Sequence, residues 1–307
     1  MKTYTLSKIA KIVGGKIQNE TDQEIRHIVT DSRKIFSPEN SLFIAIVGKR
    51  HNGHNYIQEL YDKGVLNFLI SEPVHFKNKL SQANFIQVPN TVGALQQLAS
   101  YHRNQFEFPV IGITGSNGKT IIKEWLYHTL ENEYNIIRSP KSYNSQIGVP
   151  LSVWPMTDAY NMAIFEAGIS FPGEMQRLQN MIRPKIGIFT NIGEAHQENF
   201  KNISQKIREK LSLFIESEVI IYCKDHEKID REILANDDLK NKKLLTWSAN
   251  YESDLEIDEV YKEDNKSRIR AIFQGRNVEI TIPFIDKGSI DNAMHVWLLL
   301  LHLGMDE

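Results

Sequence analysis

From residue 109 onward, the chain alternates between short apolar runs and segments whose apolar residues recur at helical spacing. Runs of this length are typical of buried strands, and helical spacing lies between most of them. The alternation predicts an α/β fold with a mostly parallel sheet flanked by helices on both faces. The predicted strands are 109–114, 134–138, 161–166, 185–190, 218–223 and 243–247.

The first hundred residues predict a smaller α/β unit. Strand-like runs lie at 41–47 and 67–70, and helical spacing predicts a helix over 91–103. A nucleotide-binding unit usually opens with its first strand, so we place the boundary just before the run at 109. The predicted domains are 1–107 and 108–307.

Two further elements are expected near the end of the chain. Apolar and polar residues alternate in 269–273 and 278–284, on either side of a Gln-Gly-Arg-Asn turn, which predicts a β-hairpin. A helix over 289–303 then ends at Gly304.

Composition narrows the class of protein. The 307 residues are 41% hydrophobic and 24% charged, as in an ordinary globular protein, and the net charge of -2 does not favour nucleic acid as a partner. The single cysteine, Cys223, cannot form an internal disulfide. The amino terminus lacks the apolar core of a secretory signal, and the apolar stretch 293–305 is too short to insert into a membrane. We therefore expect a cytoplasmic protein.

The segment GITGSNGKT at 112–120 carries the clearest functional signal. It joins a predicted strand to a predicted helix, as a phosphate-binding loop does, although Ile113 stands where the strict motif has glycine. The alternative interpretation is a tight glycine turn before an amphipathic helix. The glycines would let the backbone approach an anion, the lysine would reach the outer phosphates, and the threonine hydroxyl would bind magnesium. The predicted nucleoside triphosphate site comprises Gly115, Ser116, Asn117, Gly118, Lys119 and Thr120.

Three more polar residues lie at or after the carboxyl ends of predicted strands, where open parallel sheets bind ligands. They are Glu166, Asn191 and His196. A hydroxyl, a carboxylate and a histidine would suit a divalent cation beside the triphosphate. Taken alone, the glutamate could equally be a solvated or capping residue, and a lone loop histidine is more often structural. Lys210 differs, because its charged neighbours predict a solvated lysine on a helix.

Several linked motifs resemble those of the Mur ligases, the ATP-dependent amide-forming enzymes of peptidoglycan precursor synthesis. Besides the phosphate loop, the resemblance is carried by TDSRKIFSPENSLFIAIVGKRHNGHNYI at 30–57, YNSQIGVP at 143–150, FEAG at 165–168, TNIGEAH at 190–196 and EKLSLF at 209–214. SNGKT with the Lys-Glu pair that follows, and TNIGEAH, are most similar to the member that adds D-alanyl-D-alanine to a UDP-N-acetylmuramoyl tripeptide. Those two compounds are the substrates that the resemblance implies.

The resemblance also implies roles for individual residues. Lys119 would hold the β- and γ-phosphates of ATP, with Thr120 and Glu166 on one Mg2+. Glu166, His196 and a carbamylated Lys210 would hold a second ion. Lys119, His196 and Lys210 are the predicted catalytic residues. Asn144 would lie near the triphosphate and Asn292 near the adenine.

The resemblance further assigns the UDP-sugar to the amino-terminal domain, at Asp31, Ser32, Arg33, His51, Asn52, Gly53 and His54. The plainer interpretation of the second group is turn chemistry, since Asn-Gly is a turn dipeptide by itself. The chain departs from the family at Ser142, where asparagine is usual. It also departs at GSIDNA before the final helix, where a histidine-asparagine pair is common.

The Mur ligases have a third, carboxy-terminal domain, which this resemblance expects to be absent from the 307 residues. The resemblance therefore does not imply that residues 1–307 are active by themselves. Some relatives carry an alanine racemase fused behind the ligase. Two alternatives stay open: a ligase that adds a diamino acid to a UDP-muramoyl dipeptide, and an unrelated P-loop kinase or nucleotide-binding module.

Overall fold

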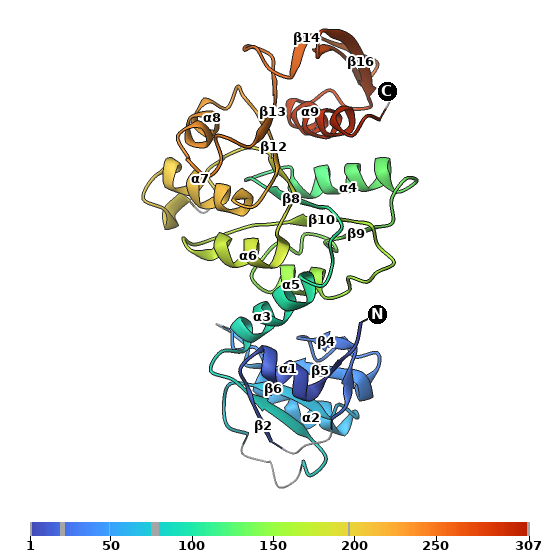
Figure 1. Ribbon diagram of the computed structural model, residues 1–307, viewed down its shortest axis with the longest axis vertical. Coiled ribbons are helices and arrows are strands. Elements are labelled where there is room, and N and C mark those ends of the chain that lie inside the picture. The colour runs from blue at the N-terminus through green and yellow to red at the C-terminus, as the bar shows by residue number, and fades with distance from the viewer. Residues whose placement is uncertain (1, 19–21, 49, 75–79, 196, 306–307) are drawn as a thin grey trace. The chain divides into compact units, whose positions relative to one another are not determined.

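The computed structural model describes residues 2–18, 22–48, 50–74, 80–195 and 197–305. It consists of two compact units (Figure 1). The first comprises Met1–Phe106 with Val153–Asp158, and the second comprises Glu107–Ser152 with Ala159–Glu307. Among the described residues, no helix combines the length and the apolar character needed to cross a membrane.

The first unit is built on a five-stranded sheet with the order β2-β7-β6-β5-β4. All neighbours are parallel except β2, which runs antiparallel to β7. A short antiparallel pair, β1 and β3, lies outside this sheet. The elements are β1 (Tyr4–Thr5), α1 (Leu6–Ile12), β2 (Lys16–Gln18), β3 (Glu24–Ile25), β4 (His27–Val29), β5 (Ser41–Ile44), α2 (Ile57–Asp62), β6 (Asn67–Ile70), β7 (Asn84–Gln87) and α3 (Thr91–Arg103), with 3-10 turns at Pro38–Asn40 and Gly53–Tyr56.

The core of this unit contains the rings of Phe43, Phe68 and Phe85, all almost completely buried. The later segment 153–158 also belongs here. Its Trp154 donates a hydrogen bond from Nε1 to the carbonyl of Arg26 at 2.8 Å. A single boundary along the sequence could not have predicted this return of the chain.

The second unit is built on a nine-stranded sheet with the order β16-β15-β14-β13-β12-β11-β8-β10-β9. Strands β8 to β14 are parallel, and β15 and β16 add antiparallel strands at one edge. The strands are β8 (Val110–Thr114), β9 (Ile136–Arg138), β10 (Met162–Glu166), β11 (Ile186–Phe189), β12 (Val219–Cys223), β13 (Lys243–Ser248), β14 (Leu255–Glu263), β15 (Lys266–Phe273) and β16 (Arg276–Ile282).

Helices flank this sheet because successive side chains of a strand point to opposite faces. Ile111, Ile113 and Ile188 join one apolar core with residues of α4 and α9, which pack against each other. On the other face, the rings of Phe189 and Phe214 meet at 6.5 Å. The helices are α4 (Lys119–Leu130), α5 (Gly148–Val153), α6 (Glu174–Ile182), α7 (Ile203–Leu211), α8 (Glu227–Leu234) and α9 (Lys287–His302), with 3-10 turns at Gln197–Asn199 and Ser212–Phe214.

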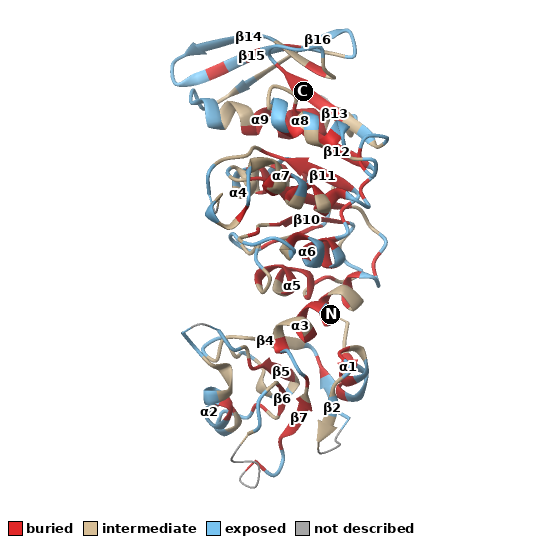
Figure 2. Ribbon diagram, turned by 90° about the vertical axis from the view of Figure 1, so that its left-hand side faces the viewer, coloured by how far each residue is buried: buried red, intermediate tan, exposed pale blue. Residues whose placement is uncertain are grey.

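The predicted α/β class, the six strands from 109 to 247, the hairpin and the final helix are confirmed. The strand β14 was not predicted. Figure 2 shows why: β14 to β16 are largely exposed, whereas the central strands are buried. An exposed strand with charged side chains lacks the apolar pattern on which the prediction depends.

The order of the strands brings the functional sequence motifs of the second unit close together. β8 opens the unit but lies between β10 and β11, both parallel to it. The carboxyl ends of these three strands therefore meet at one edge of the sheet, at a point where the strand order reverses. The phosphate loop, Glu166 and Asn191 follow from these ends.

Candidate active site

The glycine-rich turn between β8 and α4 is closely packed. Gly115 has φ of 144° and Gly118 has φ of 83°, a region that L-residues rarely adopt. A Cβ atom at 115 would lie 2.0 Å from Thr190 Oγ1, and one at 118 would lie 2.2 Å from Asn292 Oδ1. Both positions therefore require glycine, for backbone conformation and for space.

Two residues of the turn are bound to the loop after β11. The amides of Ser116 and Asn117 donate to Asn191, to its carbonyl at 2.9 Å and to its Oδ1 at 3.0 Å. Thr190 Oγ1 donates to the Asn117 carbonyl at 2.5 Å, and the Gly193 amide donates to Ser116 Oγ at 2.8 Å. The amides at the start of α4 remain as the donors that a helix amino terminus offers to an anion.

Lys119 lies at the start of α4 and folds back over the turn. Its Nζ donates to the carbonyls of Gly115 at 2.8 Å and Ser116 at 3.0 Å. Burial lowers the pKa of Lys119. It borders a pocket of about 180 Å³ that is also lined by Gly115, Ser116, Asn144, Ser145, Gly168, Ile169, Ser170, Ala195 and Lys210.

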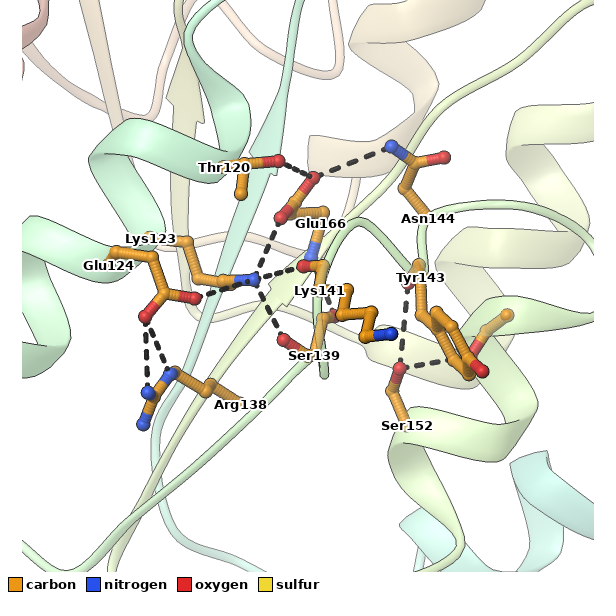
Figure 3. A network of polar contacts seen from close by, with 11 residues as sticks. Thr120, Lys123, Glu124, Arg138, Ser139, Lys141, Tyr143, Asn144, Ser152 and Glu166 are labelled. Atoms are coloured by element: carbon orange, nitrogen blue, oxygen red, sulfur yellow. Dashed lines mark hydrogen bonds and ion pairs between the residues drawn. The ribbon is translucent and has the colours of Figure 1, made fainter. Parts of the chain in front are cut away.

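Thr120 and Glu166 meet beside this turn (Figure 3). The Thr120 hydroxyl donates to Glu166 Oε2 at 3.0 Å, and Asn144 Nδ2 donates to the same oxygen at 3.4 Å. Glu166 is completely buried. Its Oε1 receives no hydrogen bond within the described part of the chain, although the ammonium group of Lys123 lies 3.1 Å away.

These oxygens fit a hard divalent cation such as Mg2+. A hydroxyl and a buried carboxylate are donors that such an ion prefers, and Oε2 is the carboxylate oxygen beside the Thr120 hydroxyl. In the described ranges, no group of three or more His, Cys, Asp or Glu side chains is arranged to hold a metal. His196, the predicted imidazole ligand, lies outside the described residues.

Lys210 is buried, with 3% exposure, and the prediction of a solvated lysine from its charged neighbours was wrong. α7 turns Lys206, Ile207, Lys210 and Leu211 inward, because residues three and four apart share a helix face. Lys210 Nζ donates to the carbonyl of Gly115 at 3.0 Å. Burial, with the nearby charges of Lys119 and Lys206, lowers the pKa of Lys210 to about 7.

Sequence reasoning missed two other buried lysines. Lys206 donates to the carbonyls of Gly193 at 2.6 Å and Ala195 at 2.5 Å, and so holds the TNIGEA loop. Lys123 lies between Ile122 and Leu126 on the buried side of α4. The available signal was a lysine at a core-facing position of an apolar helical stripe.

Asn292, the predicted adenine residue, lies on α9 and is 6% exposed. Its side chain fills the space in front of Gly118. The structure therefore brings Asn292 to the phosphate loop, 174 positions earlier in the sequence. Gly115, Ser116, Asn117, Lys119, Thr120, Asn144, Glu166 and Lys210 lie in the same region of the second unit.

The predicted sugar-binding residues lie in the first unit, after the neighbouring parallel strands β4 and β5. Asp31 accepts two hydrogen bonds from the Arg33 side chain, both 2.9 Å long, and this contact lowers the pKa of Asp31 to about 2. Ser32 lies between them and is partly buried, as is Gly53, whereas His51 is exposed.

The His54 ring forms hydrogen bonds to other residues of the first unit. Its Nε2 accepts from the amides of Ser71 at 3.0 Å and Glu72 at 3.1 Å, so Nδ1 carries the proton and donates to Asn52 Oδ1 at 2.8 Å. Burial lowers the pKa of His54, which keeps the ring neutral. Asn52 and His54 are thus engaged in the turn, as the plainer interpretation of this segment expected.

Comparison with known proteins gives two family matches. Residues 113–300 match the Mur ligase middle domain, and residues 24–103 match the Mur ligase family catalytic domain. The UDP-N-acetylmuramoyl-tripeptide--D-alanyl-D-alanine ligase of Borreliella burgdorferi is 33% identical over 98% of this chain and 65% of the relative. The chain spans about three fifths of the length of the curated relatives it matches.

Two solved structures show the same fold. MurF from Acinetobacter baumannii aligns with a TM-score of 0.87 over 100% of this chain and 66% of that one, at 22% identity. The MurF ligase from Thermotoga maritima in complex with ADP aligns with a TM-score of 0.79 over 92% of this chain and 64% of that one, at 21% identity.

Proposed function

This chain belongs to the Mur ligase family, and on that premise we propose that it acts in the ATP-dependent joining of D-alanyl-D-alanine to a UDP-N-acetylmuramoyl tripeptide. The observation that carries the proposal is the meeting of Thr120 and Glu166 beside Lys119. The relatives named for this activity match nearly the whole chain. The sister ligase for a diamino acid and an unrelated P-loop kinase are the alternatives.

Lys119 and the first amides of α4 would bind the phosphates of ATP. The Thermotoga relative was solved in complex with ADP, which supports nucleotide binding by this fold. Thr120 and Glu166 would hold one Mg2+, and Glu166, His196 and a carbamylated Lys210 would hold the second. Bound magnesium would neutralise charge on the phosphates and on the transferring group. Asn144 and Asn292 would contact the triphosphate and the adenine.

The low pKa of Lys210 supports its carbamylation. An amine with a pKa of about 7 is substantially neutral near pH 7. Its nitrogen lone pair can form a bond to the carbon of CO2, and the nitrogen then loses a proton, which leaves an anionic carbamate. This change converts a cation into an oxygen ligand.

The proposed reaction has two steps. The terminal carboxylate of the tripeptide forms a bond to the γ-phosphorus, and the bond from that phosphorus to the bridging oxygen breaks, which gives an acyl phosphate and releases ADP. The amine of D-alanyl-D-alanine then attacks the acyl carbon and loses a proton, while phosphate leaves. Lys119 and the α4 amides would orient the triphosphate and counter its charge. No side chain of this chain needs to act as a nucleophile.

The proposed sugar site uses Asp31, Ser32, Arg33 and the turn at 51–54. Arg33 and His51 are exposed, so both are accessible to a negatively charged ligand. Cytoplasmic localisation, a further carboxy-terminal domain and a fused racemase remain predictions.

Calorimetry on the 307-residue chain tests the proposal without requiring turnover. We expect binding of a non-hydrolysable ATP analogue with Mg2+, and loss of that binding in Lys119→Ala. UDP-muramoyl tripeptide should bind more tightly than the dipeptide. Preference for the dipeptide would favour the sister ligase, and nucleotide binding with no affinity for either peptide would favour a kinase or other nucleotide-binding module.

A further inference from the structure

Lys123 is a fully enclosed cation near the site, and the proposed reaction does not use it. It lies on α4 one turn after Lys119, and its side chain is 0% exposed. Figure 3 shows its ammonium group at the centre of the network. The group lies 3.1 Å from Glu166 Oε1 and 3.0 Å from Glu124 Oε1, and it donates to the carbonyls of Ser139, at 2.8 Å, and Lys141.

Lys123 lies on the opposite side of the Glu166 carboxylate from Thr120 and Asn144. The ammonium occupies the Oε1 side, while Thr120 and Asn144 both contact Oε2. The carboxylate is therefore held from both sides in one orientation. Lys123 forms an ion pair with this buried carboxylate, with 3.1 Å between Nζ and Oε1.

Lys123 also holds the loop that carries Asn144. It binds the carbonyls on either side of Pro140, and Lys141 adopts a left-handed φ of 52°. Such a conformation is unfavourable for a residue with a side chain and persists where neighbouring contacts enforce it. The same loop is joined to β10 through Ser139 Oγ, which accepts from the Glu166 amide at 3.2 Å.

The network contains two pairs of opposite charge, Lys123 with Glu166 and Arg138 with Glu124. Arg138 contacts Glu124 Oε2 at 3.1 Å, so Glu124 has a second cation of its own. The charge of Lys123 is then available to Glu166. Replacing Arg138 would disturb Glu124 without touching the acid that faces Thr120, which makes this residue a matched control.

We propose that Lys123 is a positioning residue, which holds the Glu166 carboxylate in the orientation that places Oε2 beside Thr120 and keeps Asn144 next to it. This inference rests on the proposed Mg-ATP site. Lys123 also repels a divalent ion at Glu166, so its removal has two opposing effects. Without Lys123, both the loop and the carboxylate lose a contact that holds them in place. We expect this loss of positioning to lower the affinity for Mg2+ by more than the loss of repulsion raises it. Partners that orient metal ligands typically change metal affinity by about 10- to 100-fold when replaced.

The test compares the affinity of the chain for a non-hydrolysable ATP analogue in Mg2+ and in EDTA. The ratio of the two affinities is the Mg2+-dependent gain. In Lys123→Met we expect this gain to fall about tenfold, while the affinity in EDTA changes less than about twofold. Arg138→Met should leave both affinities close to those of the unaltered chain.

A second comparison separates positioning from folding. Lys123→Gln keeps a hydrogen-bond donor at the site, so the Mg2+-dependent gain should fall less in this variant than in Lys123→Met. It also replaces Lys123→Met in the test if that variant does not fold. In a Glu166→Gln background, Lys123→Met should lower the gain no further, because the ligand on which it acts is already absent. Thermal unfolding of each variant reports whether the unit is intact.

Three results would overturn the proposal. An equal loss of affinity in Mg2+ and in EDTA would assign Lys123 a purely structural role. An unchanged or larger Mg2+-dependent gain would show that repulsion dominates. Absence of any gain in the unaltered chain would refute the proposed function itself, and the positioning role with it.

Discussion

The hydroxyl of Thr120 donates a hydrogen bond to Glu166 Oε2 at 3.0 Å, although 46 positions separate the two residues. They meet because β10 lies directly beside β8, the strand that leads into the phosphate loop. The order of the strands thus brings the hydroxyl and the carboxylate together, although no single sequence motif contains both residues.

Replacing Thr120 by valine should remove the hydroxyl and keep the shape of the side chain. We expect Mg2+-dependent binding of an ATP analogue to weaken about tenfold or more, since the residue would be both a ligand and a partner of Glu166. Stability should fall by about 1 kcal/mol. Thr129→Val is the matched control, because Thr129 is on the same helix and donates only to Trp125. Equal binding losses in both variants, measured by calorimetry, would contradict the assignment.

Lys210→Met should stabilise the chain while weakening the proposed metal site. Folding lowers the pKa of Lys210 from 10.5 to about 7, so the buried ammonium destabilises the fold in full below pH 7, and this penalty disappears as pH rises toward 10.5. At pH 7 this penalty is about 4 kcal/mol, and the hydrogen bond to Gly115 that methionine cannot make offsets about 1 kcal/mol of it. We expect a gain of about 3 kcal/mol at pH 7 in bicarbonate-free buffer, measured by urea denaturation, and a smaller gain at higher pH. A variant less stable than the parent at pH 7 would show that the hydrogen bond to Gly115 outweighs burial.

Gly118→Ala should abolish nucleotide binding. The added Cβ would lie 2.2 Å from Asn292 Oδ1, and the residue has φ of 83°. Gly275 offers a matched control, with φ of 76° and nothing within 4 Å of the Cβ that alanine would add. Both alanine variants should lose about 1 kcal/mol of stability for the backbone conformation, and only Gly118→Ala should lose binding as well. Calorimetry and thermal unfolding on the two variants decide this.

Acid should destabilise the first unit through His102. Its ring accepts from Tyr4 Oη at Nδ1 and donates from Nε2 to the Met156 carbonyl, and burial lowers its pKa to about 4. Because the folded pKa lies below the unfolded value of 6.5, stability is complete above pH 6.5 and is lost as pH falls toward 4. The contribution is about 3 kcal/mol.

His102→Gln is the corresponding test. The variant should be less stable than the parent at pH 7, and the difference should narrow by about 3 kcal/mol at pH 4, since glutamine does not titrate. Urea denaturation followed by fluorescence can detect this, because Trp154 lies 4.9 Å from the His102 ring. A difference that stays constant with pH would assign the acid sensitivity to other groups.

The sequence predicted the parts of the fold in which burial is regular. Strands such as β8 and β10 are buried along their whole length, and their apolar runs are visible in the sequence. The strand β14 has mostly exposed side chains, so its pattern carried no such signal. Short motifs located the phosphate loop because glycine conformation and chemistry are both encoded locally.

The helical stripe marks the buried lysines as core-facing positions but does not identify what they bind. Lys123, Lys206 and Lys210 are on helices, where lysine is usually solvated, and the packing of the whole unit encloses them. Each one donates to backbone carbonyls of loops that are distant in sequence. A pattern read along one helix does not contain those partners.

β8 lies between β10 and β11, whereas the hairpin strands β15 and β16 lie at the far edge of the sheet. Additions beyond β13 lengthen the sheet and leave the three strands around the phosphate loop in place. The turn at Asp264 and Asn265, both with positive φ, lies in that outer ribbon. We therefore expect a fluorescent reporter or affinity tag inserted at this turn to report on the protein without disturbing the phosphate loop.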